Sequence, residues 1–107
     1  METILVISNL PDREQAERLA AHLIGLRLAA CVNVLAPCTS VYRWQGKVET
    51  AQEVPVLIKT TRARYVALEM AIKAFHPYEL PEIIALPITA GLPAYLDWVD
   101  NETNESH

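Results

Sequence analysis

The stretch from Val32 to Trp44 carries more strand-forming residues than a chain of this length buries in one core. Unbroken, such a strand extends about 40 Å, whereas a domain of 107 residues has a radius of gyration of about 13 Å. The pair Gln45-Gly46 follows directly and favours a two-residue hairpin turn, because glycine tolerates positive φ. We therefore expect a long hairpin that either projects beyond its own core or folds back at Pro37.

A projecting hairpin would expose two aromatic side chains near its tip, those of Tyr42 and Trp44. A two-stranded ribbon is only marginally stable alone, and its free edges favour pairing with another chain. We predict that the hairpin packs on sister subunits in a closed ring. A mobile hairpin with surface aromatics is the alternative.

The turn also predicts the register of the hairpin. With the turn centred on Gln45-Gly46, Trp44 faces Lys47 on the opposite strand. Arg43 then faces Val48, and Tyr42 faces Glu49. Because side chains alternate along a strand, the two aromatic residues then share one face of the ribbon.

Apolar patterning and turn residues predict the elements of the first half. A nearly continuous apolar run indicates a buried strand over Thr3–Ser8. Asp12, followed three residues later by Gln15, is typical of a helix N-cap. An apolar stripe with helical spacing then predicts a helix from Arg13 that ends near Gly25 to Arg27.

The second half repeats the order strand, helix, strand. Further strands are predicted over Cys31–Leu35, Thr39–Trp44, Lys47–Glu49, Val54–Thr60 and Ile83–Ile88, with an interruption at Ala36-Pro37. Thr60 or Thr61 is expected to cap a second helix, whose apolar face includes Val66 and Met70 and which Pro77 ends at His76. A short last helix is predicted over Ala94–Val99. Pro55 and Pro87 lack the N–H of a strand ladder, which predicts edge, bulge or strand-end positions.

Two strand–helix–strand units joined by a hairpin predict an α+β fold. The arrangement is the ferredoxin-like, split β-α-β sandwich, with an antiparallel sheet and both helices on one face. Right-handed crossovers in each half leave little freedom in the strand order.

Composition excludes several classes of protein. The formal net charge is −4, but Asp97, Asp100, Glu102 and Glu105 alone account for it, so residues 1–96 are neutral and unsuited to gripping nucleic acid. No apolar run reaches the roughly 20 residues of a membrane-spanning helix, and no basic segment precedes the first apolar stretch. We expect one cytosolic domain over residues 1–100, with residues 101–107 as an acidic, frayed tail and no membrane or nucleic-acid partner.

Five segments together resemble the CutA divalent-cation tolerance family, over about residues 3 to 100. They are Leu28–Asn33, Tyr42–Glu49, Leu57–Thr60, His76–Ile83 and Tyr95–Val99. The resemblance implies a ferredoxin-like subunit in a compact homotrimer whose long hairpins embrace neighbouring subunits, an assembly similar to that of the PII signalling proteins. It also implies a role in tolerance to copper and other divalent cations, with metal binding in some members.

The candidate metal ligands are His76 and Cys31. Copper favours imidazole and thiolate ligands, and a histidine at the end of the second helix matches the ligand that the resemblance implies. The thiol implied near the end of the first strand is replaced here by Ser8. The alternatives are that His76 only caps its helix and that Cys31 is an inert, buried thiol.

A second candidate site lies at the expected subunit boundary. Its residues are Glu53, Lys59, Tyr78 and Glu82, with Tyr42 and Trp44 from a neighbour's hairpin. A lysine with carboxylates and aromatic rings suits a small ion, and a structural ion-pair network is the alternative.

The sequence contains no recognisable catalytic motif: it has neither the spacing of a Ser-His-Asp triad nor a glycine-rich phosphate-binding loop. We therefore expect a non-enzymatic homotrimer that binds or relays a divalent metal, with copper as the candidate ion. The alternative is a trimer that senses a small ligand or scaffolds a partner through its intersubunit clefts, as PII-like proteins do.

Overall fold

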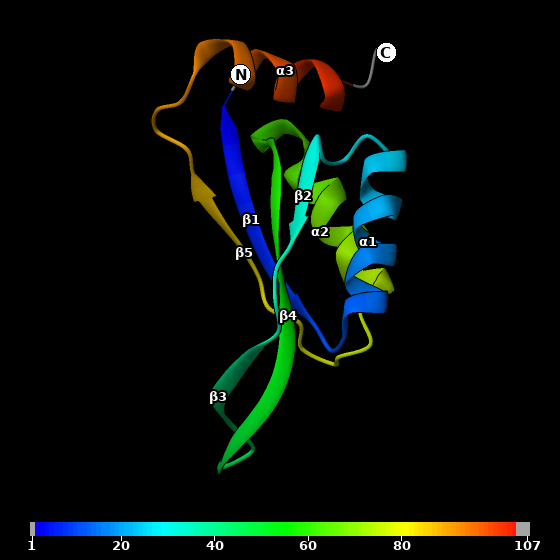
Figure 1. Ribbon diagram of the computed structural model, residues 1–107, viewed down its shortest axis with the longest axis vertical. Coiled ribbons are helices and arrows are strands. Elements are labelled where there is room, and N and C mark those ends of the chain that lie inside the picture. Colours follow the sequence, from blue (N-terminus) through cyan, green and yellow to red (C-terminus); the bar gives the residue numbers. More distant parts are fainter. Residues whose placement is uncertain (1, 105–107) are drawn as a thin grey trace.

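The computed structural model describes residues 2–104, and its elements follow one another in the predicted order (Figure 1). The strands are β1 (Thr3–Leu10), β2 (Cys31–Val34), β3 (Cys38–Trp44), β4 (Lys47–Thr61) and β5 (Ile83–Pro87). The helices are α1 (Arg13–Gly25), the short 3₁₀ turn η1 (Arg62–Arg64), α2 (Tyr65–Phe75) and α3 (Pro93–Thr103).

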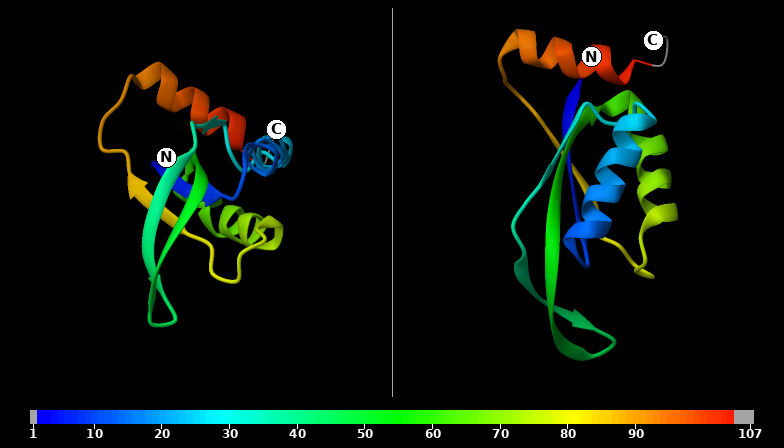
Figure 2. Two further views of the ribbon diagram at one scale, coloured as in Figure 1. Left: turned by 60° about the horizontal axis from the view of Figure 1, so that its bottom comes forward. Right: turned by 45° about the vertical axis from the view of Figure 1, so that its right-hand side comes forward.

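The strands form one antiparallel sheet in the order β2-β4-β1-β5, which is that of a ferredoxin-like fold. β3 pairs with the first half of β4 beyond the end of β2, so β2 and β3 are two parts of one line broken at Ala36-Pro37, as predicted. β3 and residues Lys47–Glu53 of β4 form a ribbon that we call the arm. Figures 1 and 2 show the arm projecting from the body, which gives the molecule an extent of 44 Å along its longest axis and 26 Å along the next.

The predicted register of the arm is confirmed. Trp44 opposes Lys47, and the next two pairs follow as expected. Gln45 and Gly46 have φ values of 50° and 81°, and positive φ at both central residues is what a type I′ hairpin turn requires.

The helices α1 and α2 cover one face of the sheet (Figures 1 and 2). Side chains that alternate along β1 and β4 point into this layer, and Leu19, Leu23, Leu68 and Ile72 of the two helices pack against them. Asp12 caps α1 as predicted, since its carboxylate accepts a hydrogen bond from the N–H of Gln15 at 2.9 Å.

The opposite face of the sheet carries no helix along most of its length. Because directly paired residues share a face, the register places Leu5, Ile7, Leu57, Ile84 and Leu86 on this side, which we call the open face. All five are half-buried or exposed in the protomer. α3 lies across the end of the sheet at which β1 begins (Figure 1).

The start of the second helix differs from the prediction. Neither Thr60 nor Thr61 caps it: Thr60 lies within β4 and its hydroxyl donates to the carbonyl of Leu28 at 2.7 Å, while Thr61 precedes η1 without a side-chain cap. Val66 and Met70 are exposed rather than part of the apolar face. Leu68 and Ile72, four residues apart, are the buried positions of α2, so the buried stripe of this helix is narrower than its composition suggests.

Two further boundaries need correction. The last helix reaches Thr103, whose buried hydroxyl donates to the carbonyl of Val99 at 2.8 Å, so residues 101–103 are helical rather than frayed. The tail from 105 to 107 lies outside the described residues. α1 ends at Gly25, but the left-handed residue that closes it is Arg27, with φ of 58°.

The two proline predictions had different outcomes. Pro87 ends the edge strand β5, as expected. Pro55 lies in the central strand β4 rather than at an edge. Its carbonyl accepts from the N–H of Leu35, and the carbonyl of Leu35 accepts from Nη2 of Arg13 at 3.4 Å, so the acceptor opposite the missing N–H has another donor.

Candidate functional site

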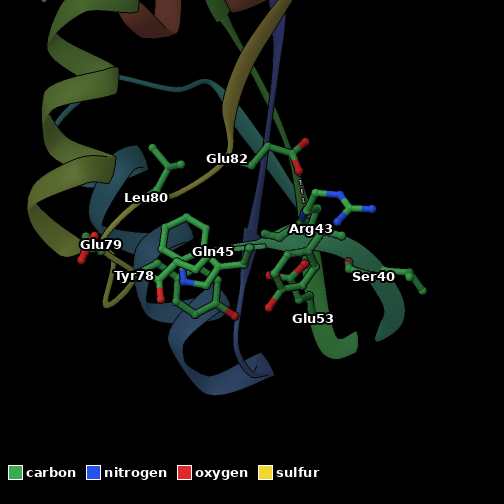
Figure 3. A pocket seen from close by; sticks show the side chains of 12 residues that line it. Ser40, Arg43, Gln45, Glu53, Tyr78, Glu79, Leu80 and Glu82 are labelled. Carbon is green, nitrogen blue, oxygen red and sulfur yellow. Dashed lines mark hydrogen bonds between the residues drawn. The ribbon is translucent and has the colours of Figure 1, made fainter. Parts of the chain in front are cut away.

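A pocket of about 800 Å³ lies where the arm leaves the body. The arm lines one side and the loop after α2 lines another (Figure 3). The end of β1 contributes Asn9. The lining residues are Asn9, Ser40, Val41, Tyr42, Arg43, Trp44, Gln45, Glu53, Tyr78, Glu79, Leu80 and Glu82. Pockets of this volume hold small molecules in many proteins.

Glu53 and Tyr78 lie together in the pocket, Glu53 buried and Tyr78 36 % exposed. Glu53 is only 8 % exposed, and it lies on β4 opposite Cys38, at the base of the arm. Burial, the charge of Glu53 and a hydrogen bond to its carboxylate raise the pKa of Tyr78 to about 12. The phenol therefore stays protonated at neutral pH and donates to the carboxylate.

His76 fixes the loop that carries Tyr78. The N–H of Tyr78 donates to Nδ1 of His76 at 3.1 Å, which assigns the ring proton to Nε2, and Nε2 then donates to the carbonyl of Asn9 at 2.6 Å. The two rings also pack together, with centroids 4.6 Å apart. His76 is 7 % exposed, so this histidine ties the end of α2 to the end of β1 and thereby positions one wall of the pocket.

Glu82 is held at the rim of the pocket. Its carboxylate accepts a hydrogen bond from Nδ2 of Asn9 at 2.9 Å. With Glu53 and Glu79 it gives the lining three carboxylates, against the single guanidinium of Arg43. The pocket is therefore acidic as well as aromatic.

Lys59 and Cys31 lie elsewhere. They are direct partners across β4 and β2 on the open face, and Nζ of Lys59 lies 3.9 Å from Sγ of Cys31 and donates to Oδ1 of Asn33. Tyr95 of α3 approaches the same thiol, and burial together with Cys31 raises the pKa of Tyr95. Lys59 is therefore the one predicted cleft residue that does not line the pocket.

The two predicted metal ligands are not brought together within one protomer. His76 bonds to Asn9, whereas Cys31 lies level with Leu5, four residues back along β1. Four residues of strand span about 13 Å, which is far more than one metal ion bridges. Among residues 2–104, no three histidine, cysteine or acidic side chains cluster as a metal site.

Five of the six predicted cleft residues line the pocket, all from a single protomer. Sequence reasoning missed Asn9, Arg43 and Glu79. Arg43 directly follows Tyr42, and Glu79 directly follows Tyr78, in segments already singled out in the sequence. Both residues could therefore have been included from their position next to a predicted site residue. Asn9 carried no such signal, because its role arises from His76 and Glu82, which are distant in sequence.

The fold and the pocket define a class: ferredoxin-like α+β proteins with a projecting hairpin and a pocket at its base. Comparison with known proteins is consistent with this class. Residues 4–102 match the family model described as CutA1 divalent ion tolerance protein. This chain belongs to that family.

Three relatives illustrate the similarity. The divalent-cation tolerance protein CutA of Thermus thermophilus is 47% identical over 103 residues, which cover 96% of this chain and 99% of that protein. The crystal structure of CutA from Xylella fastidiosa has a TM-score of 0.94 at 44% identity, and the match covers 97% of this chain and 100% of that one. The periplasmic divalent cation tolerance protein CutA of Archaeoglobus fulgidus gives a TM-score of 0.92 at 37% identity, over 95% and 99% of the two chains.

Proposed function

We propose that this protein serves divalent-cation tolerance as a non-enzymatic homotrimer that senses a small ligand in the pocket at the base of each arm. The observation that carries the proposal is the position of the pocket. It lies between the projecting arm and the body (Figure 3), so a bound ligand would contact the same ribbon through which the protomer would contact its neighbours.

The trimer is supported by two surfaces that a lone protomer leaves uncovered. On the arm, Val41 and Val48 are 66 % and 65 % exposed. The open face adds the apolar side chains of Ile84 and Leu86, which are also exposed. Apolar surface of this extent on two sides of one protomer favours burial against further copies.

The absence of catalysis is also part of the proposal. Glu53 and Tyr78 bind each other, and both ring nitrogens of His76 are engaged in hydrogen bonds that hold the loop. These groups suit positioning and binding better than proton transfer, because a general base needs a free acceptor within reach of its substrate.

The proposed test combines assembly and ligand response. Sedimentation velocity at low micromolar concentration should give three times the protomer mass of 12.0 kDa. A thermal-shift screen of metal ions, small anions and small organic cations should then find at least one stabilising class. That response should disappear in Glu53→Gln and persist in Glu14→Gln, which removes an exposed acid from α1. A monomer, or a screen without any stabilising ligand, would refute the proposal.

A second candidate is binding or relay of a divalent metal, copper among them, through His76 and Cys31 of different protomers, since one protomer keeps the two side chains apart. The family description favours it, and Cys31 is a free, half-buried thiol. Ligation by His76 would have to replace one of its two ring hydrogen bonds. Titration calorimetry with cuprous and cupric ions under reducing conditions tests it: His76→Ala and Cys31→Ser should each weaken binding, and unchanged binding in both rules the site out.

We also place the trimer in the cytoplasm. Cys31 and Cys38 are both free, which suits a reducing compartment, and no helix within residues 2–104 is long and apolar enough to cross a membrane. Because one relative is described as periplasmic, the location needs its own test. Fractionation of the native cells should recover the protein with cytoplasmic markers, and recovery in another compartment would refute this part of the proposal.

A further inference from the structure

The pocket has a charge and a surface chemistry that select among ligands. Its lining holds three carboxylates and one guanidinium, and three aromatic rings, those of Tyr42, Trp44 and Tyr78. A small anion would meet net repulsion from this lining. A cation would meet net attraction, and its apolar part would find aromatic surface.

The buried carboxylate is the strongest element of this chemistry. Glu53 lines the pocket and is more than nine-tenths buried, yet no ion pair in residues 2–104 involves it. Its described partner is the hydroxyl of Tyr78, which is neutral. A buried carboxylate without a counter-charge is costly, so a cation delivered to this pocket would gain more from Glu53 than from an exposed acid.

The aromatic rings decide what kind of cation fits. The faces of tryptophan and tyrosine attract ammonium and guanidinium groups, and most strongly where water is excluded. Tyr78 is suited to this role because its hydroxyl is hydrogen-bonded to Glu53 and the residue lines the pocket. The ring is therefore held beside the carboxylate, and a cation bound there would contact both.

A metal ion fits the same pocket less well. Divalent metals need several oxygen, nitrogen or sulfur ligands at about 2.0–2.6 Å, and no acidic cluster with that geometry exists among the described residues. Glu82 is moreover engaged by Asn9. Separated carboxylates around aromatic walls suit a bulky cation whose charge is spread over several atoms.

We propose that the pocket at the base of the arm binds a small organic cation, an ammonium or guanidinium group on an apolar or aromatic body, with Glu53 as its counter-charge. The proposal rests on the pocket being the ligand site of the proposed function and specifies its ligand class. Every lining residue comes from one protomer, so the ligand site needs no side chain from a neighbouring copy.

Titration calorimetry of the full chain with benzyltrimethylammonium tests the proposal, with benzyl alcohol as the uncharged probe of similar shape and benzoate as the anionic one. Benzyltrimethylammonium should bind at least tenfold more tightly than either of the other two. Glu53→Gln should weaken its binding at least tenfold, and Trp44→Leu should weaken it several-fold. Glu14→Gln, which removes the same charge from an exposed side chain that does not line the pocket, should bind as the wild type does.

The failures are distinguishable. Equal binding of the three probes, no binding of benzyltrimethylammonium, or full binding by a folded Glu53→Gln would overturn the organic-cation proposal. If an anion or a metal ion still stabilises the wild type through Glu53 in the thermal-shift screen, the proposed function stands and only the ligand class is wrong. If Glu53→Gln does not fold, Tyr42→Leu decides, because this side chain lines the pocket and is exposed; unchanged binding there counts against the proposal.

Discussion

At the scale of single residues, Ser8 is an anomaly of the core. It is fully buried on the helix-facing side of β1, and among residues 2–104 its hydroxyl is the buried side-chain polar atom without a hydrogen-bond partner. A buried hydroxyl without a partner costs about 1–3 kcal/mol. The sequence marks this position only through the thiol that the family resemblance implies there.

Replacing Ser8 by alanine should therefore stabilise the protein, by about 1 kcal/mol. Thr60→Val is the matched control, because Thr60 is equally buried but its hydroxyl donates to Leu28. The control should destabilise by a similar amount. Urea unfolding at a fixed protomer concentration measures both, and a loss of stability in Ser8→Ala would show that this hydroxyl has a partner after all.

Tyr78 makes a prediction about alkaline pH. Its pKa is raised from 10.0 to about 12 in the folded protein, so the native state holds this proton more tightly than the unfolded state does. The stability contributed by the protonated phenol is complete below pH 10 and is lost as the pH rises towards 12. Wild type should thus lose stability faster than Tyr78→Phe in this range.

Absorbance at 295 nm measures the ionisation directly. The difference between wild type and Tyr78→Phe should titrate near pH 12 when folded and near pH 10 in denaturant. A native midpoint near 10 would mean that Glu53 does not hold the phenol.

At the scale of elements, the arm determines how far the protomer depends on its neighbours. Trp44 lies at the end of β3, beyond the body. In the proposed trimer, Trp44→Ala should weaken assembly by more than about 1 kcal/mol per interface, since buried interface aromatics often contribute that much. Sedimentation across a dilution series should show earlier dissociation than for Val66→Ala, which shortens an exposed side chain of α2. Identical profiles for the two variants would remove Trp44 from the interface.

The elements also show what the sequence predicted and what it missed. The hairpin was predictable to the residue because a two-residue turn leaves one register, and the Asp12 cap because its signal is local. The end of α1 was not, since the left-handed position falls on Arg27 rather than on a glycine. Pro55 misled for a different reason: only the tertiary structure reveals that the acceptor opposite its missing N–H has another donor, Arg13.

The candidate site divides in the same way. Tyr78 and Glu82 share one loop, and Tyr42 and Trp44 share one ribbon, so each pair was visible as a local motif. Lys59 was placed with them because it ends a strand pattern. The alternation along β4 instead turns it towards Cys31 on the open face. Which motif faces which is decided by packing between distant segments, and no local pattern encodes it.

At the scale of the whole molecule, the open face makes the strongest prediction about assembly. Ile84→Asp would put a charge on an exposed apolar position of β5, which a lone protomer tolerates but a buried interface does not. We expect at least a tenfold rise in the concentration at which the proposed trimer dissociates, with an unchanged far-ultraviolet circular dichroism spectrum. Val66→Asp on α2 is the control and should sediment as the wild type does. A trimer that survives Ile84→Asp unchanged would place the open face outside the interface.

The two sides of the hairpin differ in strand continuity. β4 continues without interruption for 15 residues from the tip into the core, whereas the limb opposite it is articulated at Ala36-Pro37. The arm thus consists of one continuous strand and one strand that begins at a break, and this break lies beside the pocket. A ligand bound in the pocket would contact the arm beside this break, where a small change of angle at the base gives a larger displacement at the tip. In the proposed trimer, ligand binding in the pocket would therefore reach the neighbouring copies as a change in the angle of the arm.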